Sequence, residues 1–319
     1  MIIKGRKIPL IILYKEALLR RIPQNSPHRP KIKEDLLKYW SGYHGECKVD
    51  RHLSTLSQKN VLILNDLQIP IGKTTFQIDS LLIFKSVALI LEVKNISGML
   101  NIGGEFNQFS RTNNDGIITG FTNPISQAER YSHHLRQWLK ANGFAQLPVD
   151  YLVVFTNPSS VLNGLPNSKQ FKQRVIKVAD LLKKLSEIQT DYPKTVLCDR
   201  DAKKAAKKLL KAHIDPPIFT KIEETILTGV QCVNCRTFGM ERKKASWYCN
   251  SCGSYDKQAH VQAIFDYFLL VNPKISNKQA RSFLHVNSSK VVHGILNSMR
   301  LNSQGENKNK QYVTPFHSV

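Results

Sequence analysis

The chain has 319 residues, of which 46 are Lys or Arg and 24 are Asp or Glu, so its formal net charge is +22 and its pI is near 9.8. Hydrophobic residues make up 41% and charged residues 22%, which is typical of a folded protein and excludes a disordered chain, a collagen-like repeat and a coiled-coil rod. The length predicts more than one domain, and the excess of positive charge indicates a polyanionic partner.

The sequence predicts a cytoplasmic protein without a membrane partner. No window approaches the roughly 18 consecutive apolar residues that a membrane-spanning helix needs. Charged residues such as Lys15, Glu16 and Arg20 follow the short apolar stretch near the N-terminus, which argues against a signal peptide. Four of the six cysteines form two CxxC pairs, a distribution typical of a metal site rather than of a secreted disulfide framework.

The first half of the chain predicts an α/β unit. A basic N-terminal extension, residues 1–35, ends in a proline-punctuated stretch over residues 22–30. Apolar spacing over residues 31–56 predicts two short helices or one kinked helix. Strands follow over residues 61–67, 74–84 and 87–94, and Lys85 and Ser86 form a hairpin-length connection between the last two. The Gly-, Asn- and Thr-rich residues 101–122 predict short strands and loops.

The α/β unit continues with a helix that begins at Pro124, capped by Asn123, and ends near Gly143. A strand over residues 150–155, a short strand over 174–178 and a helix over 180–188 complete the unit. A basic helical linker is predicted over residues 191–227, and it includes a lysine-rich helix from Asp199 to His213. The lysines of this helix form either a solvated face or a surface that leads a phosphate backbone toward the site. Its lysines are Lys203, Lys204, Lys207, Lys208 and Lys211.

Three charged residues interrupt the two most apolar strands. Asp79 lies in the strand over residues 74–84, and Glu92 and Lys94 lie in the strand over 87–94. Because side chains alternate along a strand, Glu92 and Lys94 must share a face. A two-residue connection would place Asp79 directly opposite Glu92. The sequence therefore predicts that both carboxylates and the amine converge on one face of the sheet.

Ionised groups on apolar strands are costly unless they are paired or bound to a metal. Two carboxylates beside a lysine can hold a hard divalent cation such as Mg²⁺, which could polarise a phosphodiester and activate an attacking water. Lys94 would then orient the nucleophile or stabilise developing negative charge. The alternative is a purely structural salt-bridged face in which Lys94 pairs with Glu92 or Asp79.

Four short motifs in this order resemble the NERD (nuclease-related) domain, a branch of the PD-(D/E)XK, or restriction-endonuclease-like, superfamily. They are Gly45-Glu46, then Gln77-Ile78-Asp79, then Glu92-Val93-Lys94-Asn95 with Gly98, and finally Asn123-Pro124-Ile125-Ser126-Gln127-Ala128. The resemblance covers roughly residues 38–157. One departure is that the superfamily's Pro-Asp pair appears here as Ile78-Asp79, which is the NERD form.

The resemblance implies a restriction-endonuclease-like mixed sheet flanked by helices over residues 36–190. It implies that Asp79 and Glu92 are ligands of a catalytic Mg²⁺, with Mn²⁺ as the alternative ion, and that Lys94 is the catalytic lysine. Glu46 would be an auxiliary acid, or else an exposed helix acid. Gln127 would lie near the substrate or metal, or else serve as a cap or in a hydrogen bond between helices.

A zinc ribbon is predicted over residues 228–256. Cys232, Cys235, Cys249 and Cys252 form two CxxC pairs whose four thiolates would fill the tetrahedral coordination of Zn²⁺, so the ion would be structural. An Fe–S or redox dithiol site is the alternative. The basic and aromatic residues of the ribbon could contact nucleic acid, or Trp247 could pack beneath the ribbon.

Residues 257–319 predict a small helical unit similar to a helix-turn-helix. Helices over residues 260–271, 276–283 and 288–299 are followed by a tail with Gly305 near its middle, which could form the wing of a winged helix. The second helix of the pair would present Asn287, Ser288, Ser289, Lys290 and Arg300 to DNA. The alternative is a helical bundle that braces the zinc ribbon.

These features together predict a Mg²⁺-dependent deoxyribonuclease with C-terminal DNA-binding modules. RNA is the alternative nucleic-acid partner. A nuclease-like adaptor that binds nucleic acid without cleaving it, or a zinc-ribbon interaction protein, are the alternative functions. The sequence leaves the substrate structure, the biological pathway and the oligomeric state open.

Overall fold

The computed structural model describes residues 1–56, 61–103, 108–113, 115–164, 169–216 and 224–316. It divides into two compact units, and each draws on two stretches of chain. The first unit contains Met1–Lys7 and Trp40–Pro216, and the second contains Ile8–Tyr39 and Pro217–Val319. The residues expected to form an N-terminal extension, 1–35, are therefore distributed over both units.

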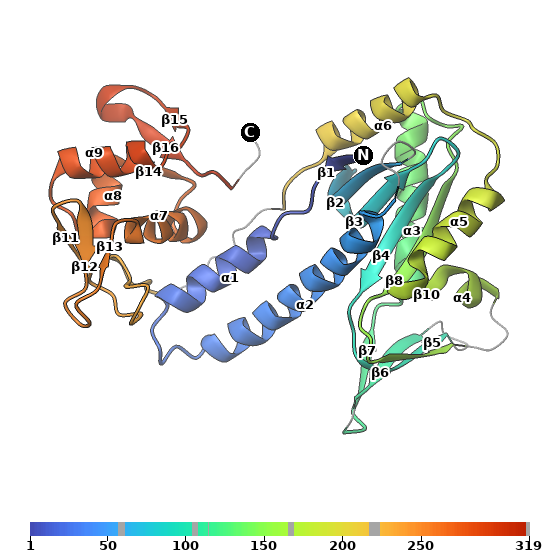
Figure 1. Ribbon diagram of the computed structural model, residues 1–319, viewed down its shortest axis with the longest axis horizontal. Coiled ribbons are helices and arrows are strands. Elements are labelled where there is room, and N and C mark those ends of the chain that lie inside the picture. Colours follow the sequence, from blue (N-terminus) through green and yellow to red (C-terminus); the bar gives the residue numbers. More distant parts are fainter. Residues whose placement is uncertain (57–60, 104–107, 114, 165–168, 217–223, 317–319) are drawn as a thin grey trace. The chain divides into compact units, whose positions relative to one another are not determined.

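A mixed six-stranded sheet forms the centre of the first unit (Figure 1). The strand order is β1-β2-β3-β4-β8-β10; β2, β3 and β4 are antiparallel, and the other neighbours are parallel. The strands are β1 (Ile2–Lys4), β2 (Leu62–Ile71), β3 (Thr74–Ile83), β4 (Ala88–Lys94), β8 (Val149–Phe155) and β10 (Val175–Lys177). The strands predicted from residue 61 to residue 178 are all present, and β1 was not predicted.

Helices cover both faces of this sheet. The apolar residues that alternate along β3, β4 and β8 divide into two buried clusters, one on each face. One cluster includes side chains of α3 (Pro124–Ala141) and α6 (Asp199–Ala212), and the other includes side chains of α2 (Arg29–Leu53) and α5 (Leu181–Asp191). This is the predicted α/β architecture, because strands buried on both faces need a helical layer on each side.

Helix α2 is one continuous element, so Ser41 and Gly42 do not break it into the two short helices that were one of the predicted alternatives. The cap predicted for α3 is also present. The side chain of Asn123 accepts a hydrogen bond of 2.9 Å from the backbone amide of Ile125, and Pro124 occupies the first turn.

A second sheet follows the end of β4. Its order is β7-β6-β5-β9, built from β5 (Gly98–Gly103), β6 (Gln108–Thr112), β7 (Ile118–Phe121) and β9 (Ser160–Gly164). Strands β5, β6 and β7 correspond to the short strands that the Gly-, Asn- and Thr-rich stretch predicted, whereas β9 was not predicted. Leu100, Ile102 and Phe109 on it belong to the same buried cluster as α3.

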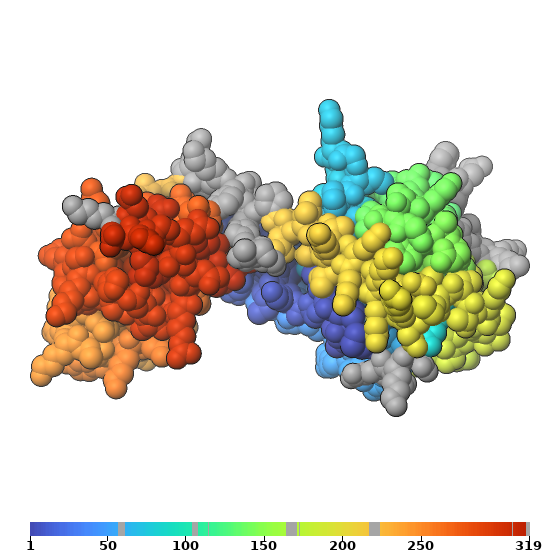
Figure 2. Space-filling model, turned by 90° about the horizontal axis from the view of Figure 1, so that it is seen from above, coloured from blue at the N-terminus to red at the C-terminus, as the bar shows by residue number. Residues whose placement is uncertain are grey.

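Helix α6 is amphipathic, with Ala202, Ala205, Ala206 and Leu209 buried. Its exposed side carries the lysine run, and Figure 2 shows the helix in yellow at the surface of the first unit. All five lysines predicted for this face are exposed: Lys203, Lys204, Lys207, Lys208 and Lys211.

The second unit has its own core, in which α1 (Leu10–Arg21) packs with α7 (Ala259–Leu270). Asp266 on α7 is 1% exposed and accepts hydrogen bonds from both Arg20 and Arg21. Arg21 is equally buried, and it also donates to the carbonyls of Leu227 and Gly229. This ion pair satisfies charges that would otherwise be costly in the interior, and it fixes the first helix to the C-terminal part of the unit.

The C-terminal part of this unit has the element order of a winged helix. Helix α7 is followed by β14 (Lys274–Ser276), α8 (Asn277–Leu284), α9 (Ser289–Ser298), β15 (Ser303–Gln304) and β16 (Gln311–Val313). The three short strands form one sheet in the order β14-β16-β15. Ser276 and Ser288 cap α8 and α9, and β15 and β16 form the predicted hairpin; β14 was not predicted.

Within the described part of the chain, no helix combines the length and apolar character needed to cross a membrane.

Candidate functional site

The β3–β4 hairpin has the register that the sequence predicts. The antiparallel ladder joins Ile83 to Ala88 and continues as far as Ser80 and Leu91. The next position on the same register places Asp79 across from Glu92. Leu91 and Val93 belong to the buried cluster on the α2 face, so Glu92 and Lys94 lie on the opposite face, toward α3.

Asp79 marks the point at which the ladder ends. Its Oδ2 accepts a hydrogen bond of 2.8 Å from the backbone amide of Val93, so a side chain replaces a backbone acceptor there. The bond fixes the Asp79 carboxylate beside the C-terminal end of β4, which also carries Glu92 and Lys94.

Glu92 is 2% exposed and only half satisfied. Its Oε1 accepts a hydrogen bond of 2.6 Å from the Lys94 amine, whereas its buried Oε2 has no hydrogen-bond partner among the described residues. A buried carboxylate oxygen without a partner is costly, and a cation is the ligand that suits it best. The arrangement therefore fits a divalent ion between Asp79 and Glu92.

Lys94 links the strand to helix α3. Besides its bond to Glu92, its amine donates to Oε1 of Gln127 at 3.3 Å. Gln127 in turn lies 3.4 Å from the hydroxyl of Tyr131, one turn further along α3. The structure thus brings Asp79, Glu92, Lys94 and Gln127 together. The side chain of Gln127 forms a hydrogen bond from helix α3 to strand β4, rather than the bond between helices that was one of the alternatives.

Burial and mutual repulsion change the acidity of the cluster. Burial, followed by the charge of Asp79, raises the pKa of Glu92 to about 8. Burial also raises the pKa of Asp79, although the bond from Val93 opposes this shift. Burial acts to lower the pKa of Lys94, but the adjacent Glu92 and Asp79 carboxylates outweigh it and the pKa is raised. The amine therefore stays charged while the carboxyls favour protonation unless a cation is present.

The carboxylate cluster lies within a stretch of the chain that matches a known protein family. Residues 41–156 match the family model of the nuclease-related domain, NERD. This stretch of the chain is therefore similar to the NERD domain. No curated protein and no solved structure matches the chain.

Glu46, the fifth expected site residue of the NERD domain, comes from the other face of the sheet. It lies on α2, where Gly45 makes the close approach possible. A Cβ atom on Gly45 would lie 2.6 Å from Cβ of Asn95 and 2.8 Å from Oγ1 of Thr156, so only glycine fits. Burial, then the negative charge of Asp79, raises the pKa of Glu46 to about 8.

Arg6 is the site residue that sequence reasoning missed. Its guanidinium forms an ion pair with Glu46 and a bidentate pair with Asp50, at 2.7 and 3.1 Å. It also donates to the carbonyl of Asp79 and to the hydroxyl of Ser80, both at 2.9 Å. An arginine in a basic N-terminal stretch gives no sequence signal of its own; its position depends on β1, which pairs with β2.

The four cysteines of the second unit form a separate cluster that could hold a metal ion. The sulfur atoms of Cys232, Cys235, Cys249 and Cys252 lie within 4.8 Å of one another. The Cys232–Cys252 and Cys235–Cys249 sulfur pairs are 3.7 and 3.5 Å apart. Tetrahedral Zn²⁺ with Zn–S bonds of about 2.3 Å requires sulfur separations of about 3.8 Å, so the cluster could bind zinc with all positions filled by protein.

Each CxxC pair lies in a tight turn. The amide of Arg236 donates to the carbonyl of Cys232, and the amide of Gly253 donates to the carbonyl of Cys249. Both residues after the pairs have positive φ, 64° and 72° respectively. Three short strands, β11 (Glu241–Lys243), β12 (Ser246–Tyr248) and β13 (Tyr255–Asp256), complete the ribbon.

Trp247 is fully buried, and its indole nitrogen donates to Nδ1 of His260 at 3.0 Å. Of the two roles that the sequence allowed for this tryptophan, packing beneath the ribbon is the one that the structure shows. The ring is therefore not exposed to stack on a base.

Replacing Arg6 with Met should destabilise the first unit. The side chain of Arg6 is 3% exposed, and its removal leaves Glu46 and Asp50 without their cation. We expect a loss of about 2 to 3 kcal/mol, below the range for fully buried pairs because these carboxylates are one-fifth to one-quarter exposed. Chemical denaturation measures the change, and exposed Lys7→Met is the matched control. Equal stability of the two variants would contradict the role assigned to Arg6.

The raised pKa of Glu92 predicts how stability depends on pH without added divalent metal. Its folded-state pKa of about 8 exceeds the unfolded value, about 4.3, so the folded state binds more protons between these limits and stability falls as pH rises through them. Glu92→Gln should be more stable than the parent at pH 8.5 and should lose less stability between pH 6 and 8.5. Part of the dependence should remain because Glu46 is shifted similarly.

Thermal denaturation at a series of pH values measures this difference. Exposed Glu187→Gln is the matched control and should leave the pH dependence nearly unchanged. An identical pH dependence for Glu92→Gln and the parent would show that Glu92 is already ionised at neutral pH.

The cysteine cluster predicts one zinc ion per chain after purification under reducing conditions. Elemental analysis by mass spectrometry measures the metal. Cys252→Ser should lower the zinc content and make the second unit susceptible to protease, because a structural zinc contributes directly to folding. Cys198→Ser, at an exposed cysteine outside the cluster, is the control and should retain the ion. Full zinc content in Cys252→Ser would refute the ligand assignment.

Proposed function

We propose that the chain is a metal-dependent deoxyribonuclease in which Asp79 and Glu92 hold a divalent cation, Mg²⁺ or alternatively Mn²⁺. The observation that supports this most directly is the buried, unpartnered Oε2 of Glu92 beside the Asp79 carboxylate. The nuclease-related domain at residues 41–156 supports the class of reaction.

A divalent cation bound there would polarise the phosphodiester and lower the pKa of an attacking water. The protein's own groups have distinct roles in this proposal. Lys94 presents a charged amine that can orient the water or stabilise the negative charge that develops on the phosphate. Gln127 and Glu92 hold that amine in place from two sides. Glu46 is an auxiliary acid, and Arg6 keeps it oriented.

DNA is the proposed substrate, in the cytoplasm. The net charge of +22 favours a polyanion, and the exposed lysine face of α6 offers phosphate contacts next to the same sheet. The zinc ribbon and the winged-helix-like part of the second unit would add further contacts with DNA. Two carboxylates beside a polyanion would repel it unless a cation lies between them, which argues for turnover rather than binding alone.

A non-catalytic adaptor is the second candidate. In its favour, every titratable group of the cluster already has at least one protein partner, because Asp79 bonds to Val93, Glu92 to Lys94 and Glu46 to Arg6. Such a network could be purely structural. The second oxygen of Glu92, which has no partner among the described residues, argues against that interpretation.

The nuclease proposal predicts that Asp79→Asn, Glu92→Gln and Lys94→Met each abolish cleavage of DNA, with losses of at least about 100-fold, as expected for removing a metal ligand or a charge-stabilising group. Labelled duplex, single-stranded and branched DNA, incubated with and without Mg²⁺, measure the activity. Lys73→Met, an exposed lysine in the β2–β3 turn, is the matched control. Cleavage without a divalent metal, or full activity in all three variants, would refute the proposed metal-dependent nuclease site. DNA that is bound but left intact would support the adaptor.

A further inference from the structure

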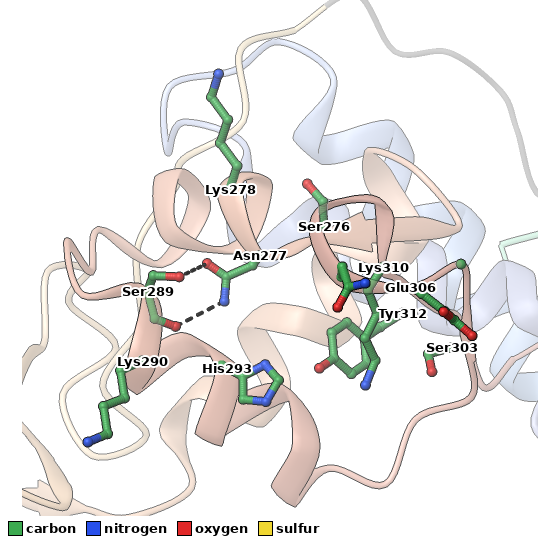
Figure 3. Close-up of a pocket in the computed structure, with 12 residues that line it drawn as sticks. Ser276, Asn277, Lys278, Ser289, Lys290, His293, Ser303, Glu306, Lys310 and Tyr312 are labelled. Atoms are coloured by element: carbon green, nitrogen blue, oxygen red, sulfur yellow. Dashed lines mark hydrogen bonds between the residues drawn. The ribbon is translucent and has the colours of Figure 1, made fainter.

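The second unit contains a groove of about 1220 Å³ that is separate from the carboxylate cluster. It lies between the N-terminal ends of α8 and α9 and the β15–β16 hairpin (Figure 3). These three elements are distant in sequence from the cluster on β3 and β4, and the proposed hydrolysis does not use them.

The groove is lined by more positive than negative charge. Lys278 on α8, Lys290 on α9 and Lys310 beside β16 are on its walls, and Glu306 contributes the carboxylate. Figure 3 shows the amines of Lys278 and Lys290 extending outward from the two helices, and Lys310 on the side of the hairpin. A long anionic ligand that crosses the groove could therefore contact lysines from three elements.

The two helix N-termini are held side by side at one wall. The side-chain amide of Asn277 donates to the backbone carbonyl of Ser289 at 3.0 Å, and the hydroxyl of Ser289 donates to Oδ1 of Asn277 at 3.1 Å (Figure 3). The partial positive charges of both helix ends thus face the same region and add to the field of the lysines.

Gly294 lies outside the residues that line the groove and leaves the neighbouring face of α9 open. It lies in the middle of α9, on the stripe that includes Lys290, and nothing within 4 Å would contact a Cβ atom at this position. Packing therefore does not require glycine there, and glycine disfavours a helix interior. A smooth, open helix face instead permits close approach by a large ligand.

We propose that this groove binds the sugar-phosphate backbone of duplex DNA without reading its sequence. The proposal rests on the DNA-binding part of the proposed function and specifies which surface of the second unit makes the contact. Lys278, Lys290 and Lys310 supply the phosphate contacts, and the open face of α9 around Gly294 lies against the duplex.

The polar groups of α9 explain why sequence is not read. Asn297 accepts a hydrogen bond from the hydroxyl of Tyr312 at 2.7 Å and contacts His293 through its amide at 2.8 Å. Asn277 is occupied by Ser289. With these two amides engaged inside the protein, the charged groups that remain at the rim of the groove are mainly lysines, which can contact phosphates.

The same walls disfavour single-stranded nucleic acid. Binding of unpaired bases depends on exposed aromatic faces for stacking. Two aromatic rings line the groove: Tyr312 is 3% exposed, and the ring of His293 contacts the side-chain amide of Asn297 at 2.8 Å. A duplex, whose bases are already stacked, needs no such platform.

The test measures DNA binding by fluorescence anisotropy over a range of salt concentrations. All proteins carry Asp79→Asn and receive no Mg²⁺, so cleavage does not interfere and the zinc ribbon is not exposed to chelator. Lys278→Ala, Lys290→Ala and Lys310→Ala combined should weaken duplex binding and lower the slope of log K against log salt by about one per lysine. Lys33→Ala, an exposed lysine of the same unit outside the groove, should change little.

Two variants test the contact in opposite directions. Glu306→Gln removes the carboxylate from the groove and should tighten duplex binding several-fold. Gly294→Gln places a long side chain on the open face of α9 and should weaken binding without lowering the thermal stability of the protein. Duplexes of unrelated sequence should bind equally well.

The inference is overturned if the triple lysine variant binds like the Lys33→Ala control, if the parent binds single strands or RNA more tightly than duplex, or if one duplex sequence is strongly preferred. These outcomes are independent of the nuclease proposal. Salt-dependent binding that requires the three lysines, with no cleavage by the wild-type chain in Mg²⁺, would refute the nuclease and leave the groove intact. Cleavage by the wild-type chain in Mg²⁺, together with unchanged duplex binding by the triple lysine variant, would support the nuclease and refute the groove proposal.

Discussion

The burial of carboxylates on apolar strands is the constraint on which the first unit depends. Asp79 and Glu92 lie where β3 and β4 are covered on both faces by apolar side chains. A charge in such a place needs a partner, and the structure supplies an amide from Val93, an amine from Lys94 and, for the neighbouring Glu46, the guanidinium of Arg6. The partners come from different positions of the chain, so several elements must be folded together before the charges of the acids are compensated.

The compensation is incomplete at one atom of Glu92, because its Oε2 has no hydrogen-bond partner among the described residues. A fully satisfied ion network would be a structural device and would leave no reason to recruit a cation. The raised pKa values of Glu46 and Glu92, both about 8, have the same origin. The raised pKa values indicate that the protein alone stabilises the ionised carboxylates poorly, which is a common property of functional sites.

Much of this arrangement could be predicted from the sequence because it depends on local periodicity. The two-residue connection at Lys85 and Ser86 fixes the hairpin register, and strand alternation then fixes which side chains share a face. Capping residues such as Asn123 and Ser276 marked helix starts for a similar reason. What could not be predicted were contacts between distant segments. Arg6 reaches the acids only because β1 joins the sheet in parallel, and short strands such as β1 and β14 have no distinctive pattern.

The second unit is assembled from the two ends of the chain, and this has a consequence for biosynthesis. Arg21 on α1 is paired with Asp266 on α7, which is 245 positions later. Until α7 has been synthesised, α1 exposes an apolar face and two arginines whose acidic partner does not yet exist. In a nascent protein, α1 must therefore wait until the 245 positions between Arg21 and Asp266 have been synthesised, a period in which a chaperone or a neighbouring polypeptide could bind it. A variant chain that lacks α1 or α7 would lose the ion pair between Arg21 and Asp266.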